Sequence, residues 1–223
     1  MPVLPVTIRW PLPARRWRAS GHWCCGDSAI TRTGAVTRLA TESERARQMT
    51  SADETGGGSG VTALRRPPVR QATMVRASAQ RTFDSFVTTI GAWWPVQPFS
   101  AGKDRVRAVT VERRRGGRVY ETWDDGTEVD WGTLTAWDPP ARFVMTWSGT
   151  PAATEVEFTF VRVGPALTRV AVEHRGWEAL TEEQLAEDCA LPGGYSSGAY
   201  AAGWATILGC LARAILRDAK AAR

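Results

Sequence analysis

A histidine stands near the end of a segment in which apolar and charged residues alternate, and it falls in the apolar set. That set is Val170, Val172 and His174. Because alternate residues of a strand face opposite sides of a sheet, His174 is expected to face the interior. One interpretation is a structural histidine whose ring nitrogens bond to neighbouring groups. The other is a polar anchor or proton shuttle, since a free imidazole titrates near about pH 6.5.

A glutamate on a second predicted strand raises a related question. Val119, Glu121 and Trp123 share one face, so an inward face places a carboxylate among aromatic rings. A buried carboxylate must be hydrogen-bonded or protonated, which makes it a candidate site residue. The structural alternative is a salt bridge with an arginine such as Arg142. An acid–base pair of Glu121 and His174 would need an approach to about 3 Å, directly or through one water.

Tryptophans supply the apolar part of the candidate site. Trp93 and Trp94 are adjacent in "GAWWPVQPF", and adjacent residues cannot share a face of a helix or strand. We therefore expect one indole to pack under the preceding helix and the other to border a cavity. An aromatic wall with a few polar groups is typical of a small-molecule site. The predicted ligand-binding residues are Trp93, Trp94, Glu121, Trp123, Trp131, Phe158, His174, Gly203 and Trp204.

The elements that position these residues follow from the hydrophobic pattern. Residues 69–75 form a first predicted strand, and a helix runs from an N-cap at Ser78 to a stop at Gly91. Six strand-like segments follow, separated by turn residues, and short connections favour an antiparallel meander. They are 106–113, 118–123, 128–137, 142–148, 154–162 and 168–175.

Two helices are predicted after the meander. Thr181 and Gln184 have the spacing of a capping box, and "LPGG" ends that short helix. A final helix of about twenty residues would span roughly 30 Å and lie across the sheet. Its apolar stripe is Tyr200, Trp204, Ile207, Leu208, Leu211 and Ile215. Gly203 in this helix is expected either to allow close packing or to leave room beneath it.

Residues 1–65 have no sustained apolar period, so we predict a disordered or non-native extension with a glycine-rich linker ahead of a domain at 66–223. Two interpretations of residues 1–48 stand open: an overextended reading frame before Met49, and an Arg-rich targeting peptide. Residues 1–68 carry ten Lys/Arg and five Asp/Glu, so the net charge of +5 belongs to this segment.

Composition argues against several function classes. The one dense basic run in the domain, "ERRRGGR" at 112–118, is expected to be a solvated hairpin tip rather than a nucleic-acid surface. The four cysteines lack metal-ligand spacing, and a reduced, cytoplasmic setting fits them best. The sequence contains no run of about 18 apolar residues, so no transmembrane helix is expected. We expect no catalytic constellation, no metal and no cofactor.

The element order and two strings resemble a known family. The strings are "GGRVYETWDDGTEVDWGTLTAWDPPARFVMTW" at 116–147 and "TEVEFTFVRVGPALTRVAVEHRGWEAL" at 154–180. They resemble the START-like (SRPBCC) superfamily, and within it bacterial homologues of the activator of the 90-kDa heat-shock protein ATPase. The resemblance covers about 66–217 and implies an α+β helix-grip fold, with a curved antiparallel seven-stranded sheet wrapped around a long C-terminal helix.

The resemblance also implies a function, more loosely than the fold. Superfamily members use a cavity between helix and sheet to carry ligands, cyclise polyketides or confer self-sacrificing resistance. We expect non-enzymatic binding of a hydrophobic small molecule by a monomer or homodimer. The alternatives are a cyclase-like or hydrolase-like enzyme, and a co-chaperone-type protein with a protein partner in stress response.

Overall fold

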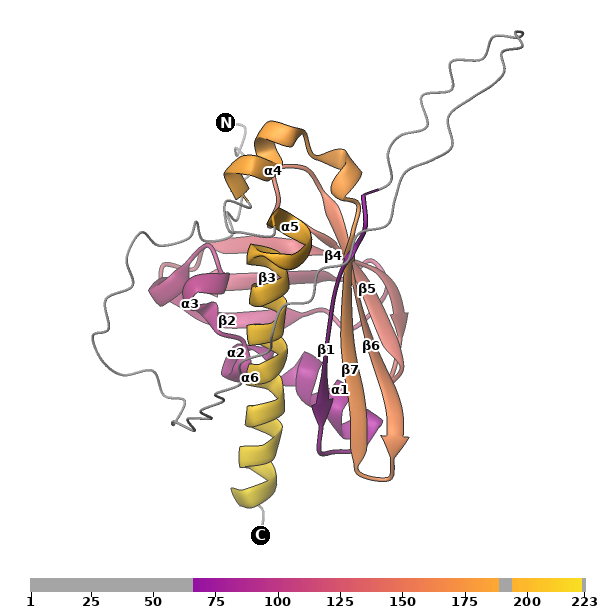
Figure 1. Ribbon diagram of the computed structural model, residues 1–223. Coiled ribbons are helices and arrows are strands. Elements are labelled where there is room, and N and C mark those ends of the chain that lie inside the picture. The colour runs from indigo at the N-terminus through magenta and orange to yellow at the C-terminus, as the bar shows by residue number, and fades with distance from the viewer. Residues whose placement is uncertain (1–65, 189–193, 222–223) are drawn as a thin grey trace, which may run out of the picture. The chain divides into compact units, whose positions relative to one another are not determined.

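The computed structural model describes residues 66–188 and 194–221, and these contain one antiparallel sheet of seven strands (Figure 1). The strand order is β1-β7-β6-β5-β4-β3-β2, so consecutive strands from β2 to β7 are neighbours and β1 joins beside β7. The strands are β1 (Val69–Val75), β2 (Val106–Val111), β3 (Arg118–Trp123), β4 (Glu128–Asp138), β5 (Arg142–Trp147), β6 (Thr154–Gly164) and β7 (Leu167–Arg175). The predicted meander is confirmed.

The helices lie between β1 and β2 and after β7. They are α1 (Ala79–Thr88), α2 (Ile90–Trp93), α3 (Val96–Phe99), η1 (Lys103–Arg105), η2 (Trp177–Ala179), α4 (Glu182–Asp188), α5 (Gly194–Ser197) and α6 (Ala199–Ala221). The long α6 runs beside β1 and packs against it, while α1 packs against β6 (Figure 1). This arrangement is the helix-grip fold.

The first helix begins as predicted and ends earlier. Ser78 accepts a hydrogen bond from the backbone N–H of Arg81 at 3.3 Å and caps α1. The stop at Gly91 is wrong, because α1 ends at Thr88 and Gly91 lies inside α2. A Cβ at Gly91 would lie 3.3 Å from the backbone nitrogen of Val109, so this glycine allows close approach to β2.

The C-terminal helices also bear out the sequence pattern. The capping box of α4 is present: Gln184 accepts from the Thr181 N–H at 2.9 Å, and Thr181 accepts from the Gln184 N–H at 3.2 Å. The predicted end at "LPGG" falls partly on 189–193, outside the described residues. Every member of the predicted α6 stripe is buried.

By length and apolar composition, Gly194–Ala221 is long enough to cross a membrane, which the sequence reading did not anticipate. Half of its most apolar window is buried within the domain, as expected for a core helix.

The two faces of the sheet differ in chemistry. The inner face and the helices share one apolar core, in which Phe86, Trp131 and Trp204 are almost fully buried. The outer face carries ion pairs, including Arg175 with Glu155 at 2.6 Å and with Glu157 at 2.8 Å. The tip of the 112–118 turn is exposed at residues 113–116, as predicted, with Gly116 at φ 76°. Candidate site residues therefore have to be sought on the inner face.

Arg66 anchors the start of the described chain. Its guanidinium donates to the carbonyl oxygens of Trp177 at 3.1 Å and Leu180 at 2.7 Å, and it pairs with Glu182. The predicted extension at 1–65 lies outside the described residues.

Candidate functional site

The adjacent indoles of α2 and its C-cap take two different positions. Trp93 contacts Phe86 of α1 with ring centroids 4.7 Å apart, and its Nε1 donates to the Phe86 carbonyl at 3.3 Å. Trp94 turns toward the sheet, where its ring lies 4.8 Å from that of Trp131. Both are buried. One indole therefore packs under α1 and the other faces the interior, the division expected from their adjacency.

A small apolar cavity lies beside Trp94. Its volume is about 10 Å³, roughly the room that one water molecule needs. It is lined by Phe86, Ile90, Trp94, Val111, Val119, Trp131, Phe143, Met145, Trp147 and Phe158. The space predicted between helix and sheet is thus filled almost completely by aromatic side chains.

Glu121 is fully buried and accepts three hydrogen bonds. Oε1 accepts from the Gly102 N–H and from Trp123 Nε1, each at 2.6 Å. Oε2 accepts from Trp131 Nε1 at 2.9 Å. The suggested salt bridge with Arg142 is wrong, because Arg142 lies on the outer face and pairs with Glu157 at 3.2 Å. The carboxylate instead orients two indoles, one of which forms a wall of the cavity.

Glu121 also ties down the segment 94–105, which we call the strap. The strap is held at one end by Trp94 in the aromatic cluster and near the other by the Gly102–Glu121 hydrogen bond. Internal bonds keep it compact, including Trp94 Nε1 to the Phe99 carbonyl at 3.0 Å. A Cβ at Gly102 would lie 2.2 Å from Trp123 Nε1, so only glycine fits here without displacement.

His174 is also fully buried, at the end of β7. Its Nδ1 accepts from Trp204 Nε1 at 3.3 Å, so its proton resides on Nε2, which lies 2.7 Å from Thr154 Oγ1. The hydrogen bonds then run in one direction: Nε2 donates to Thr154, Thr154 to Thr150 at 3.0 Å, and Thr150 to the Ala152 carbonyl at 2.7 Å. This is the structural interpretation of His174, with both nitrogens bonded.

The imidazole is held neutral. Burial lowers the pKa of His174 from its ordinary value to about 3, because the charged form would lose its hydration. Protonation would also place a second donor on Nδ1, facing the Trp204 N–H.

The acid–base hypothesis required Glu121 and His174 to meet. Glu121 bonds to Gly102, Trp123 and Trp131, and His174 bonds to Thr154 and Trp204, so their partners have no member in common. Trp147 lies between these groups, with its ring 6.4 Å from that of Trp131 and 6.2 Å from that of His174. The geometry does not assemble an acid–base pair.

Comparison with known proteins places this architecture in a family. The family model for activator of Hsp90 ATPase homolog 1-like (AHSA1-like) proteins matches residues 76–214. The chain belongs to this family. The match begins at the residue after β1 and ends within α6. No curated protein matches the chain.

Several solved structures are similar to this AHSA1-like domain. An anthrahydroquino-Gama-pyrone synthase, Txn09, complexed with SUM, is 30% identical over 62% of this chain and 97% of its own, with a TM-score of 0.40. The self-sacrificing resistance protein CalC from Micromonospora echinospora is 27% identical over 68% of this chain and 96% of its own, with a TM-score of 0.47. An AHSA1-like protein from Aeromonas hydrophila is 19% identical over 68% and 94%, with a TM-score of 0.43.

The structure brings together some of the predicted site residues of this AHSA1-like domain. Trp94, Trp131 and Phe158 line the cavity. Trp204 reaches the same cluster from α6, with its ring 5.6 Å from Phe158 and 5.3 Å from Trp147.

The remaining predicted residues support or flank the cavity. Trp123 and Glu121 stand behind the Trp131 wall. Trp93 packs against α1 and His174 lies beyond Trp147. Gly203 is buried on the α6 face that also carries Tyr200 and Trp204.

Sequence reasoning missed three cavity residues on β5 of the AHSA1-like domain. Phe143, Met145 and Trp147 alternate in "RFVMTW" and all point inward. That alternation was a usable signal. Thr150 and Thr154, which complete the His174 network, had no such signal, because hydroxyl residues at strand ends are common on surfaces.

The described part of the AHSA1-like domain offers no metal site, since residues 66–188 and 194–221 contain no group of three or more His, Cys, Asp or Glu side chains placed to hold an ion.

Proposed function

We propose that this AHSA1-like domain binds a flat, hydrophobic small molecule in the interior between the strap, the sheet and α6. The observation that carries the proposal is the cavity lining, in which all ten side chains are apolar or aromatic and six are rings. The rings of this cluster contact one another at tilted and T-shaped angles. A planar aromatic ligand can contact these rings in the same geometries.

Binding requires the strap to move. Ordinary ligand pockets hold about 300 to 1,000 Å³, whereas the volume here is about 10 Å³. Trp94 fills the space, and it belongs to the strap, whose regular elements are only the short α3 and η1. Displacement of Trp94 with the strap would open the chamber while the Glu121–Trp131 bond keeps the opposite wall in place.

The proposed role is binding without catalysis. The buried Glu121 and His174 are each hydrogen-bonded to protein groups, and a general acid or base must reach the proton that it transfers. The proposal includes a cytoplasmic location, and a role in stress response remains a prediction.

Native mass spectrometry of the protein purified from its own cells tests this function. We expect an added mass that denaturing conditions release as an apolar molecule. The molecule is then incubated with wild type, Glu121→Gln and His174→Gln, and it should be recovered chemically unchanged. A new product formed by wild type and lost in both variants would replace the binding role with an enzymatic one.

A further inference from the structure

The outer face of the sheet holds one arginine that differs from its neighbours. Arg70 pairs with Glu173 at 2.8 Å, and Arg142 and Arg175 pair with Glu157 at 3.2 and 2.8 Å. Arg169, on the outer face of β7, has no ion pair or hydrogen bond to any residue of 66–188 or 194–221, and its side chain is exposed. Its charge is therefore available to a group from outside the domain.

Exposed apolar side chains flank this arginine across the strands. Met74 of β1 and Val161 of β6 both pair in register with Arg169, and they are 46% and 51% exposed. Val163, two residues farther along β6, is 55% exposed. These are three of the four large hydrophobic residues exposed in the described part of the chain. We call Met74, Val161, Val163 and Arg169 the Arg169 patch.

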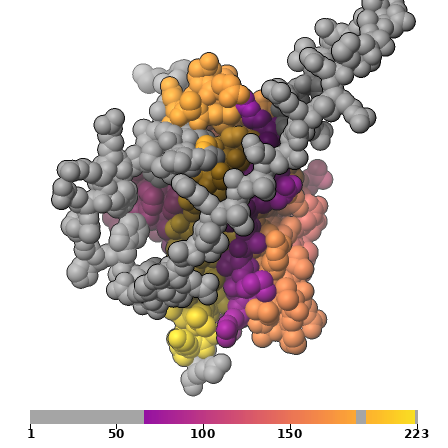
Figure 2. Space-filling view, viewed as in Figure 1, coloured from indigo at the N-terminus to yellow at the C-terminus, as the bar shows by residue number. Residues whose placement is uncertain are grey.

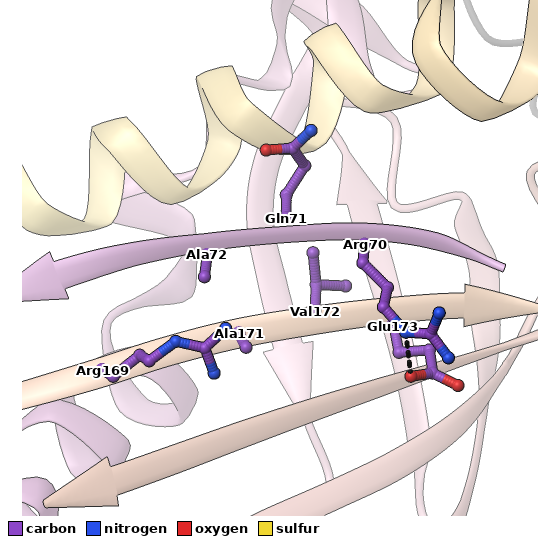
Figure 3. Close-up of a pocket in the computed structure, with 7 residues that line it drawn as sticks. All are labelled: Arg70, Gln71, Ala72, Arg169, Ala171, Val172 and Glu173. Carbon is purple, nitrogen blue, oxygen red and sulfur yellow. Dashed lines mark hydrogen bonds and ion pairs between the residues drawn. The ribbon is translucent and has the colours of Figure 1, made fainter.

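A hollow of about 380 Å³ adjoins the patch on β1 and β7 (Figure 3). Ala72 and Ala171 face each other across the two strands, and these short side chains leave a low floor. The Arg70–Glu173 ion pair stands on one side of the floor and Arg169 on the other (Figure 3). β1 and the β6–β7 hairpin lie side by side at the surface (Figure 2).

We propose that the Arg169 patch and this hollow dock a segment of a partner protein that carries a carboxylate between apolar side chains. The guanidinium of Arg169 can take a carboxylate through two hydrogen bonds. Met74 and Val161 would cover the apolar neighbours, and clustered exposed hydrophobic groups mark interaction sites. The patch is on the face of the sheet opposite to the aromatic cavity, so this inference does not depend on the proposed ligand.

The charges nearby favour a protein segment over an anionic membrane. Glu157 and Glu173 pair across β6 and β7 on the same outer face, one position beyond Thr159 and Ala171, and Glu155 follows them. These carboxylates are already paired with Arg70, Arg142 and Arg175, so Arg169 offers one unmatched positive charge. One such charge suits a single carboxylate, whereas binding to an anionic membrane relies on a cluster of basic residues.

Fluorescence anisotropy tests the docking site on the full chain with a labelled extended peptide that carries one glutamate, valines two residues before and after it on the same face, and serines elsewhere. We expect saturable binding that weakens about fivefold or more in Arg169→Glu, the scale of an exposed ion pair with added repulsion. Arg169→Lys keeps the charge but loses the two-bond geometry, so its affinity should lie between those of wild type and Arg169→Glu. A double variant Met74→Ser, Val161→Ser should also weaken binding. Arg113→Glu is the matched control, because Arg113 is exposed on the 112–118 tip and has no ion pair or hydrogen bond to another described residue.

Each of the following four outcomes would overturn the proposal. Peptide binding that is equal in Arg169→Glu and Arg113→Glu would show nonspecific attraction. Absence of peptide binding, with Arg169-dependent binding to phosphatidylserine vesicles, would make the patch a membrane site. Absence of both, with Arg169-dependent dimerisation in sedimentation velocity, would make it a self-association surface. Absence of all three would leave the patch without a docking role.

Discussion

Trp131 Nε1 donates a hydrogen bond to Glu121 Oε2 at 2.9 Å, and the ring of Trp131 lines the cavity 4.8 Å from that of Trp94. The hydrogen bond and the ring contact together fix the orientation of this buried indole. The cavity wall and the strap therefore depend on one carboxylate.

Replacing Glu121 with glutamine should destabilise the domain. The amide offers one acceptor oxygen and an NH₂ group to a site that presents three donors. We expect the free energy of unfolding to fall by about 1 to 3 kcal/mol, measured from urea midpoints. Glu173→Gln on the outer face is the matched control and should cost less than about 1 kcal/mol. Equal losses of unfolding free energy in both variants would mean that the buried hydrogen bonds of Glu121 stabilise the domain no more than the surface ion pair of Glu173.

His174 should make stability depend on pH below neutrality. Its pKa is about 3 in the folded domain and about 6.5 in the unfolded chain, so protons bind the unfolded state first. The stabilisation is present above about pH 6.5 and is lost as the pH falls toward 3, by about 1.4 kcal/mol per pH unit.

Thermal melts between pH 7.5 and 5.5 measure this loss. The midpoint should fall by about 3 to 6 °C, and His174→Gln should remove most of the slope. The chain has only two histidines, so His22→Gln is the control and should keep the slope. A slope unchanged in His174→Gln would show that other groups cause it.

Gly102→Ala should disturb the strap. The added methyl group would lie 2.2 Å from Trp123 Nε1, and relief requires movement of the indole or the strap away from Glu121. Such overpacking costs about 1 to 3 kcal/mol. Gly164→Ala, where the new Cβ would meet Leu167 Cβ at 3.7 Å, should be nearly neutral in the same urea titration. A neutral Gly102→Ala would show that the strap adjusts freely at this point.

The domain boundary can be tested at Arg66. A chain that begins at Arg66 keeps the bonds to Trp177 and Leu180 and should melt like the full chain. Arg66→Ala in that chain should lower the unfolding free energy by about 1 to 3 kcal/mol. A large loss on truncation alone would make residues 1–65 part of the fold.

The sheet could be predicted from the sequence because its inner residues alternate with polar ones, as Phe158 and Val172 do, and because turn residues separate the strands. The end of α1 could not, since Gly91 serves a contact with Val109 from a distant strand rather than a helix stop. A local sequence pattern predicts local structure, whereas the glycine at position 91 is required by a tertiary contact.

The site was predictable in its residue types and less so in its contacts. Burial of Glu121 and His174 followed from strand alternation. Their hydrogen-bond partners could not be predicted in the same way. Gly102 lies in the strap, which has no hydrophobic period. Thr154 is brought to His174 by the register of β6 and β7. The cavity volume depends on side-chain packing within an ångström, which no sequence pattern specifies. The Arg169 patch could not be predicted either, because its residues come from three strands that the fold brings together.

The most direct test of the binding role is a titration of tryptophan emission with a flat, apolar fluorescent probe. Val111 lines the cavity, so Val111→Phe should fill it, whereas the neighbouring Thr110 lies outside that lining and Thr110→Phe is the control. The account predicts saturable binding to wild type and Thr110→Phe, weakened about tenfold or more in Val111→Phe, which is about 1.4 kcal/mol. Equal binding by all three folded proteins, or no saturable binding to wild type, would contradict it.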